Sequence, residues 1–324
     1  MAIREINDSK KFGRIGVLMG GPSTEREVSL KSGKAVCDAL KALSLEVVGI
    51  DITTDSQEEN IRLIKSHHLD CAFIALHGRF GEDGQIQEIL DRLKIPYTGS
   101  GALASKLAMD KIASLHIFEI NGLRVPGYEV IEISSYSPGW KAHHKLGFPL
   151  VIKPATHGSS IGLSIIDNAN QLDKAVVLAF SFDSRVIIQE YIAGREITVG
   201  ILDTLVLPVI EIIPKNRFFD YEAKYQAGMT DYIVPAKLDE GIAKKAQSAA
   251  LSAHRALGCF GCSRVDMILD KENVPFVLEI NTIPGFTQTS LLPRAARVAG
   301  IDFAGLCLKL IELAYEKAKN KPGD

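Results

Sequence analysis

The sequence has few cysteines, five in 324 residues. These are Cys37, Cys71, Cys259, Cys262 and Cys307. An odd number of scattered cysteines is typical of reduced thiols and not of a disulfide framework. Only Cys259 and Cys262 form a Cys-x-x-Cys pair, whereas a structural zinc site needs about four ligands. The pattern predicts that the cysteines pack in the core.

An excess of positive charge is also missing, because 37 Lys and Arg residues stand against 39 Asp and Glu, a formal net charge of −2. Binding to the phosphate backbone of nucleic acids calls for a basic excess. No apolar run approaches the roughly 20 residues that span a bilayer, and the polar N-terminus lacks the apolar core of a signal peptide. We therefore expect no nucleic-acid partner, no membrane partner and a cytoplasmic location.

The sequence does have an ordinary globular composition, with 46% hydrophobic and 23% charged residues. At about 150 residues per domain, its length predicts two or three domains. In the first hundred residues, short apolar runs at 14–19, 46–52 and 71–76 alternate with helical periodicity at 28–43, 58–66 and 86–93. This βαβαβα pattern predicts an α/β fold with a doubly wound parallel sheet. The turn after the first strand lacks the Gly-x-Gly-x-x-Gly fingerprint of dinucleotide binding.

The pattern changes at residue 102. A helix is expected at 102–120, and strands at 148–153, 161–166 and 185–189 with a helix at 171–180 predict a small α+β domain. Two strands are expected at 196–202 and 205–213. A polar, aromatic stretch follows at 214–235, with the length of a functional lid or a disordered segment. The rest is expected to form helices around a hairpin.

The hairpin at 262–281 is the most informative segment. Pairing across its turn is expected to place Arg264 opposite Glu279 and Asp266 opposite Val277. Alternation then puts Arg264, Asp266, Glu279 and Asn281 on one face, and it directs a second set to the core: Val265, Met267, Phe276, Leu278 and Ile280. Three hard oxygen ligands beside an arginine suit Mg²⁺ bound together with phosphates. A solvated face with an Arg–Glu pair is the alternative.

Two further segments are candidates for ligand contacts. A strand carries Lys153 into a Gly/Ser-rich turn whose amides could close over phosphates, and Lys111 is a second cation; an ordinary turn and a solvated lysine are the alternatives. Near residue 25, Thr24 and Glu27 fit a helix capping box, and Glu25 lies where a carboxylate favours the helix dipole or could hold a ligand ammonium.

Taken together and in order, these segments resemble the D-alanine:D-alanine ligases of the ATP-grasp superfamily. The matching segments lie at residues 20–30, 76–84, 97–101, 109–111, 153–162, 189–196, 220–225, 264–266 and 279–285. The resemblance implies an N-terminal Rossmann-like substrate domain (1–101), a small central ATP-grasp domain (102–194) and a C-terminal ATP-grasp domain (195–324) with the metal hairpin and a lid loop at 214–235. It also implies a homodimer.

The resemblance further implies that the chain binds ATP as a co-substrate between its second and third domains. Lys111 and Lys153 would contact the phosphates, Gln189, Glu190, Tyr191 and Ile192 the adenine, and Glu196 the ribose. Lys224 and Leu278 would belong to the same site. Asp266, Glu279 and Asn281 would hold two Mg²⁺ ions, with Mn²⁺ as a substitute. Gln189 departs from the family, in which an acidic residue is common at this position.

For the amino-acid substrates, the resemblance implies that Glu25 binds the ammonium of the first D-alanine, while Arg264 and the Gly285 amide stabilise the oxyanion. Ser290 and Leu291 would contact the second D-alanine, with His77 nearby. Tyr225, on the lid, would be linked through Ser159 to Glu25. The implied reaction forms D-alanyl-D-alanine through D-alanyl phosphate for peptidoglycan precursor synthesis. The alternatives are a D-alanyl-D-lactate or D-alanyl-D-serine ligase, another ATP-grasp carboxylate-amine ligase, and a nucleotide-binding regulator without catalysis.

Overall fold

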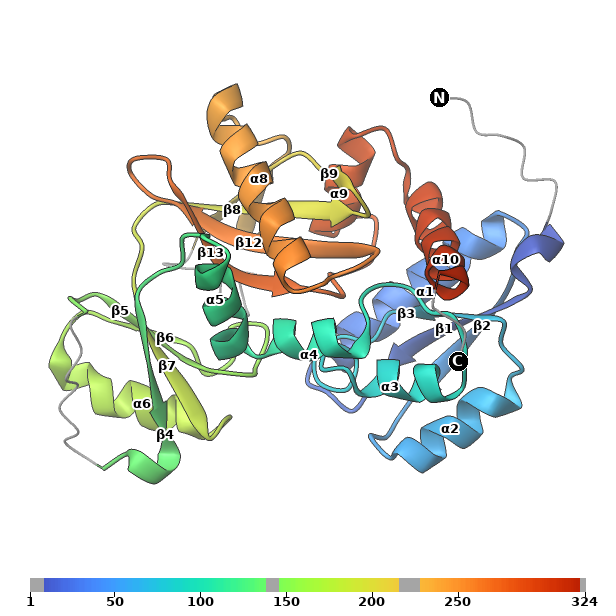
Figure 1. Cartoon of the computed structure of the whole chain (residues 1–324), viewed down its shortest axis with the longest axis horizontal. Coiled ribbons are helices and arrows are strands. Elements are labelled where there is room, and N and C mark those ends of the chain that lie inside the picture. Colours follow the sequence, from blue (N-terminus) through green and yellow to red (C-terminus); the bar gives the residue numbers. More distant parts are fainter. Residues whose placement is uncertain (1–8, 138–145, 216–227, 321–324) are drawn as a thin grey trace.

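The computed structural model describes residues 9–137, 146–215 and 228–320. These residues form three sheets that follow one another along the chain, with two short helices running between the first sheet and the second (Figure 1). The sheets appear in the order of the three expected domains, whose boundaries stay a prediction. Within the described ranges, no helix has the length and apolar character needed to cross a membrane.

The first sheet is parallel, in the order β2-β1-β3. Its elements are β1 (Arg14–Gly20), α1 (Arg26–Ala42), β2 (Glu46–Ile52), α2 (Gln57–Ser66), β3 (Cys71–Ile74) and α3 (Gln85–Arg92), after a 3₁₀ turn η1 (Ser9–Phe12). The predicted βαβαβα pattern is confirmed. The predicted capping box is wrong, because α1 begins at Arg26 and Glu25, at its N-cap, makes no side-chain cap hydrogen bond.

The helix predicted at 102–120 is two helices, α4 (Ala102–Met109) and α5 (Lys111–Ile120). They separate at Asp110, whose backbone is extended and whose carboxylate accepts hydrogen bonds from the amides of Ile112 and Ala113. An aspartate at this position is a strong N-cap, so it starts a new helix. The break places Lys111 at the start of α5, with its side chain buried.

The second sheet is antiparallel in the order β4-β7-β5-β6. It comprises β4 (Tyr128–Glu132), η2 (Ile133–Ser135), β5 (Leu150–Pro154), β6 (Ser164–Ile166), η3 (Ala169–Gln171), α6 (Leu172–Phe180) and β7 (Arg185–Glu190). The predictions omitted β4. α6 packs on the face that carries Ile188, and α5 packs on the opposite face at Ile187.

The third sheet has the order β11-β10-β8-β12-β13, with β9 paired to β8. Its elements are β8 (Arg195–Leu202), β9 (Leu205–Val206), β10 (Ile210–Pro214), β11 (Thr230–Ile233), α8 (Glu240–Ala256), β12 (Cys262–Leu269), β13 (Pro275–Asn281), α9 (Leu291–Val298) and α10 (Phe303–Lys319). The strand predicted at 205–213 is two strands, and part of the predicted lid is strand β11. Residues 216–227, with Lys224 and Tyr225, lie outside the described residues.

The two faces of the third sheet differ in character. One face packs against α8 through a core that includes Val199, Val265 and Met267. The opposite face carries the polar residues of the hairpin and also packs against α9, where a Cβ on Gly200 would lie 2.6 Å from a methyl group of Leu292. Glycine at this position therefore allows α9 to approach the sheet closely.

The predicted hairpin register is wrong. Arg264 lies opposite Asn281 and Asp266 opposite Glu279, and beyond them a bulge shifts the pairing so that Met267 faces Val277. The register differs from the expected one by an even number of residues at the polar end, so Arg264, Asp266, Glu279 and Asn281 still share a face. Leu278 is the extra residue of the bulge, and Val277 takes the core place expected for Phe276 and Leu278.

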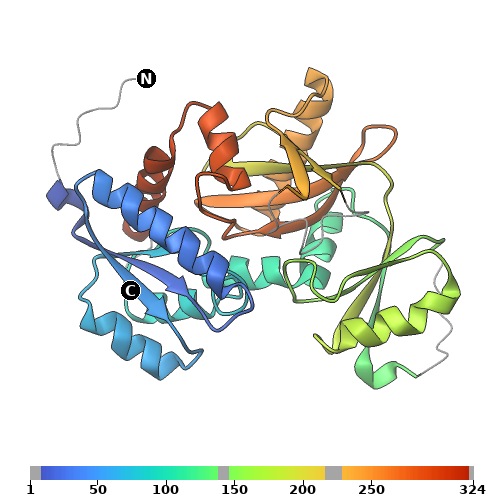
Figure 2. The ribbon, with the colours of Figure 1, turned by 180° about the vertical axis from the view of Figure 1, so that it is seen from behind.

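The C-terminal helix α10 returns to the first sheet. It lies beside α1 and adds Leu306, Leu310 and Ile311 to the core on that face, while α2 and α3 cover the other face (Figures 1 and 2). The cysteines are free thiols and pack in these cores as predicted; burial raises the pKa of Cys259 and Cys262 to about 12.

Candidate active site

A cavity of about 890 Å³ opens where the first sheet, the central domain and the third sheet meet. Many of the predicted site residues line it: Glu25, His77, Lys111, Ser159, Arg264, Glu279, Asn281, Gly285, Ser290 and Leu291. These residues are spread over more than 260 positions of the sequence, so only the folded chain brings them together. Asp266 is 7% exposed and accepts hydrogen bonds from Arg264, which lines the cavity.

The hairpin contributes a network of charges to this cavity. Arg264 donates two hydrogen bonds to Asp266, of 2.8 and 2.7 Å, and Asp266 also accepts one of 2.6 Å from the hydroxyl of Thr198 on β8. Glu279 lies 3.3 Å from the ammonium group of Lys111, the first residue of α5. The predicted polar face is thus confirmed, and it is supported by Thr198, which no sequence motif marks.

Glu25 and Ser159 meet across the cavity from two different domains. The Ser159 hydroxyl donates a hydrogen bond to the Glu25 carboxylate. Close to this pair, a Cβ on Gly78 would lie 2.7 Å from Glu25 Oε2, and the positive φ of 73° at Gly78 also favours glycine. The part of the expected link between Glu25 and Tyr225 that falls within the described residues is therefore present.

The loop that holds Ser159 is anchored at its N-terminal end. Thr156 donates hydrogen bonds to Asp183 from its amide, at 2.8 Å, and from its hydroxyl, at 2.6 Å. Lys111 donates to the carbonyl of His157 at 2.7 Å. Although burial opposes it, these hydrogen bonds from Thr156, with one from the Arg185 amide, lower the pKa of Asp183 below its ordinary value. Asp183 was not predicted as a site residue, because no local motif marks it.

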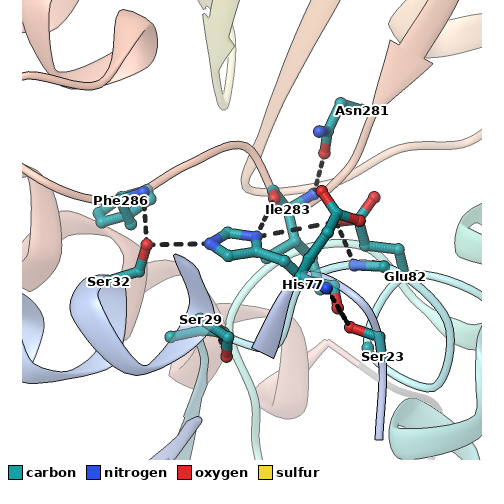
Figure 3. A network of polar contacts seen from close by, with 12 residues as sticks. Ser23, Ser29, Ser32, His77, Glu82, Asn281, Ile283 and Phe286 are labelled. Carbon is teal, nitrogen blue, oxygen red and sulfur yellow. Dashed lines mark hydrogen bonds and ion pairs between the residues drawn. The ribbon is translucent and has the colours of Figure 1, made fainter. Parts of the chain in front are cut away.

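His77 lies in a buried network beside the cavity (Figure 3). Its ring contacts Ser32 on α1 and the carbonyl of Ile283 on the loop after β13. Glu82 lies 3.7 Å from the ring and accepts a hydrogen bond from the Gly78 amide. Burial raises the pKa of the Glu82 carboxyl above its ordinary value. Neither Ser32 nor Glu82 was predicted as a site residue; only the fold reveals them.

The remaining predicted residues that the structure describes do not line this cavity. Lys153 is 7% exposed, and Gln189 is 2% exposed on the sheet face that α5 covers. Among the described residues, Gln189 Nε2 has no hydrogen-bond partner. Four other predicted residues lie between the end of β7 and the start of β8, namely Glu190, Tyr191, Ile192 and Glu196. Leu278 lies at the bulge of β13.

Comparisons with known protein families agree with the sequence resemblance. The family model described as D-ala D-ala ligase C-terminus matches residues 117–312, and the model described as D-ala D-ala ligase N-terminus matches residues 14–63 and 53–100. The D-alanine–D-alanine ligase of Pelotomaculum thermopropionicum is 46% identical over 312 residues, covering 94% of this chain and 97% of the relative. That of Geotalea uraniireducens is 45% identical over 313 residues, covering 96% and 98%.

Solved structures agree as well. The D-alanine–D-alanine ligase from Bacillus anthracis complexed with ATP has a TM-score of 0.84 at 35% identity, covering 95% of this chain and 99% of that one. The VanG D-Ala:D-Ser ligase from Enterococcus faecalis has a TM-score of 0.82 at 32% identity, covering 93% and 99%. These findings confirm the resemblance and the ATP-grasp fold drawn from the sequence. The chain belongs to the D-alanine–D-alanine ligase family of ATP-dependent ligases.

Proposed function

We propose that the cavity joins two D-alanine molecules at the expense of ATP, with Glu25 holding the ammonium group of the first. The observation that carries this proposal is the convergence, in one cavity, of the Glu25–Ser159 pair with the Lys111–Glu279 pair. The first pair suits an amino acid, and the second offers a cation and a carboxylate for a phosphate and its metal. We further propose a cytoplasmic homodimer.

The second amino acid is assigned to the start of α9. Ser290 is the N-cap of this helix and Leu291 its first residue, so the amides there face outward with the positive end of the helix dipole. Such a position favours a carboxylate. Arg264 and Gly285 line the same cavity, and we assign Arg264 and the Gly285 amide to the oxyanion.

ATP is assigned to a position beside the second sheet. Lys111 and Lys153 would neutralise its phosphates, while Gln189, Glu190, Tyr191 and Ile192 would line the adenine and Glu196 the ribose. Leu278 belongs to this assignment because the bulge excludes it from the core. Lys224 and Tyr225 keep their proposed roles at the nucleotide and at the Glu25–Ser159 pair.

The hairpin fits Mg²⁺, with Mn²⁺ as a substitute. Asp266, Glu279 and Asn281 supply only oxygen ligands from one sheet face, and within the described residues no group of three His, Cys, Asp or Glu side chains could hold a metal alone. Magnesium is typically held by one or two carboxylates together with substrate phosphates. Two ions bound there would neutralise the triphosphate.

The proposed reaction has two steps. The carboxylate of the first D-alanine attacks the γ-phosphorus of ATP, ADP leaves and D-alanyl phosphate forms. The neutral amine of the second D-alanine then attacks the acyl carbon, a C–N bond forms, the amine loses a proton and phosphate leaves. The chain contributes position and charge neutralisation, without a covalent intermediate on the protein.

A substrate panel tests the proposal. Phosphate release from ATP is measured with D-alanine, L-alanine, and D-alanine mixed with D-serine or D-lactate, and the products are separated by chromatography. We expect release with D-alanine alone and D-alanyl-D-alanine as the main product. The likeness to a D-Ala:D-Ser ligase makes D-alanyl-D-serine the second candidate. A preference for D-serine or D-lactate would overturn the assignment of the second substrate, and no D-alanine-dependent release would overturn the proposal.

A further inference from the structure

The loop after β13 is held from the first domain by two buried side chains. His77 Nδ1 lies 3.0 Å from the carbonyl oxygen of Ile283, and the amide of Phe286 donates to Ser32 Oγ at 3.2 Å. The two side chains also bond to each other, with His77 Nε2 2.9 Å from Ser32 Oγ. Figure 3 shows this bridge from α1 through the histidine ring to the loop. We call Ser32 and His77 together the loop clamp.

The partners determine the direction of two of the three hydrogen bonds in the loop clamp. A carbonyl only accepts, so Nδ1 of His77 carries the proton and donates to Ile283. An amide only donates, so Ser32 Oγ accepts from Phe286. The third bond joins Nε2 and the Ser32 hydroxyl, and either group can donate it. The clamp is therefore a continuous chain of hydrogen bonds that runs through the histidine ring.

The clamped loop contains the residue assigned to the oxyanion. Gly285 lies between the two clamped residues, Ile283 and Phe286, and Asn281 Oδ1 additionally accepts from the Ile283 amide at 2.8 Å. The part of the chain that the structure describes offers no acceptor to the Gly285 amide. The clamp thus fixes the backbone on both sides of an amide that lines the cavity and remains available to a ligand.

Burial makes the clamp stiff. The exposed fraction is 0% for Ser32 and 3% for His77, so water does not compete for their bonds. Oxyanion donors are effective when they already point at the place where charge develops, and a misplacement of about 1 Å can cost about 100-fold in rate. A side chain that only orients such a donor therefore affects the rate without touching the substrate.

We propose that Ser32 and His77 are positioning residues that aim the Gly285 amide at the reacting acyl group. The inference rests on the proposed function, in which Gly285 stabilises the oxyanion. It predicts that loss of the clamp slows the chemical step while leaving ground-state binding of ATP and D-alanine nearly unchanged.

The chain provides a matched control in Ser29. Ser29 lies one helical turn before Ser32 on α1, is also 0% exposed, and also makes two hydrogen bonds. Its partners are the Gly20 amide and the Ala75 carbonyl, both within the first domain. Ser29→Ala therefore removes an equally buried hydroxyl from the same helix without releasing the loop.

The experiment compares Ser32→Ala with Ser29→Ala in D-alanine-dependent phosphate release, with thermal unfolding of each. We expect Ser32→Ala to lower kcat by about 10- to 100-fold with KM values within about threefold. Ser29→Ala should keep kcat within about threefold of wild type despite a comparable loss of Tm. A second measurement is the affinity for an aminoalkyl phosphinate with tetrahedral geometry, which should weaken in parallel with kcat/KM in Ser32→Ala only.

His77 gives an independent test. His77→Asn keeps an amide donor near the Nδ1 position, whereas His77→Leu keeps none, so kcat should fall in the order wild type, His77→Asn, His77→Leu. Equal kcat in Ser32→Ala and Ser29→Ala, or in the two His77 variants, would overturn the loop clamp. A wild-type protein without D-alanine-dependent turnover would instead overturn the proposed function, so the two failures are distinguishable.

Discussion

Glu279 illustrates what one residue does in this site. It lies opposite Asp266, forms an ion pair with Lys111, and its side chain is 27% exposed. We expect Glu279→Gln to lower phosphate release by at least about 100-fold and to raise the Mg²⁺ concentration needed for half-maximal activity, because a charged ligand is lost. Since the residue lies on the cavity face and outside the core, the Tm should change little.

The measurement is phosphate release against Mg²⁺ concentration, with Glu240→Gln as the control. Glu240 is exposed, and among the described residues its ion pair is with Lys244 on the same helix, so its change should leave activity unaltered. Wild-type turnover by folded Glu279→Gln would remove Glu279 from the metal assignment.

Gln189 presents a buried amide nitrogen without a partner among the described residues, on the same sheet side as Lys153. An amide can accept from the adenine N6 group and donate to N7, whereas a carboxylate only accepts. We expect wild type to lose about fivefold in kcat/KM when 7-deaza-ATP replaces ATP, the effect of about one neutral hydrogen bond. Gln189→Glu should show almost no difference between the two nucleotides.

Steady-state kinetics with both nucleotides tests this prediction. Gln171→Glu, at an exposed position of η3, is the control and should keep the wild-type ratio. If wild type used both nucleotides equally well, Gln189 would not donate to N7.

At the scale of an element, α8 contains a titrating group in its packed face. His254 is 4% exposed, contacts the Ser263 hydroxyl at 2.7 Å, and burial lowers its pKa from 6.5 to about 4. The unfolded chain therefore takes up a proton at a higher pH than the folded chain. The contribution of His254 to the free energy of unfolding is fully present above about pH 6.5. It is lost as the pH drops toward 4, by up to about 3 kcal/mol.

Urea unfolding at pH 7.5 and at pH 4.5 measures this contribution. In His254→Gln, the difference in unfolding free energy between the two pH values should shrink by about 2 kcal/mol relative to wild type. His116→Gln, at an exposed position, should leave the difference unchanged. An unchanged difference in His254→Gln would show that His254 does not titrate as proposed.

At the scale of the whole molecule, α10 joins the end of the chain to its beginning. Ile311 is fully buried in the cluster that also holds β1 and α1, and the Tyr315 hydroxyl donates to the carbonyl of Phe12 at 2.6 Å. We expect Ile311→Ala to cost about 2 to 5 kcal/mol of unfolding free energy, because the cavity it leaves lies inside a packed core.

Chemical denaturation checks this value, with Glu316→Ala on the exposed side of the same helix as the control. The control should change the unfolding free energy by less than about 0.5 kcal/mol. A loss below about 1 kcal/mol in Ile311→Ala would mean that α10 contributes little to the first domain.

The sequence by itself determined the elements whose signal is local. The strands and helices of the first sheet follow from apolar periodicity, and the family follows from the order of short polar segments between Gly20 and Gly285. The shared face of Asp266 and Glu279 also follows from alternation, because a register error of an even number of residues keeps side chains on their face.

Tertiary structure alone decided the features that depend on distant partners. The bulge at Leu278 arises from the pairing of two strands, so the sequence pattern of neither strand predicts it. The bond of Ser32 to the Phe286 amide joins residues 254 positions apart. Such contacts are formed by packing between domains, and periodicity reports only on neighbours along one element. The chemistry of this site could therefore be named from the sequence, while the clamp that aims it required the fold.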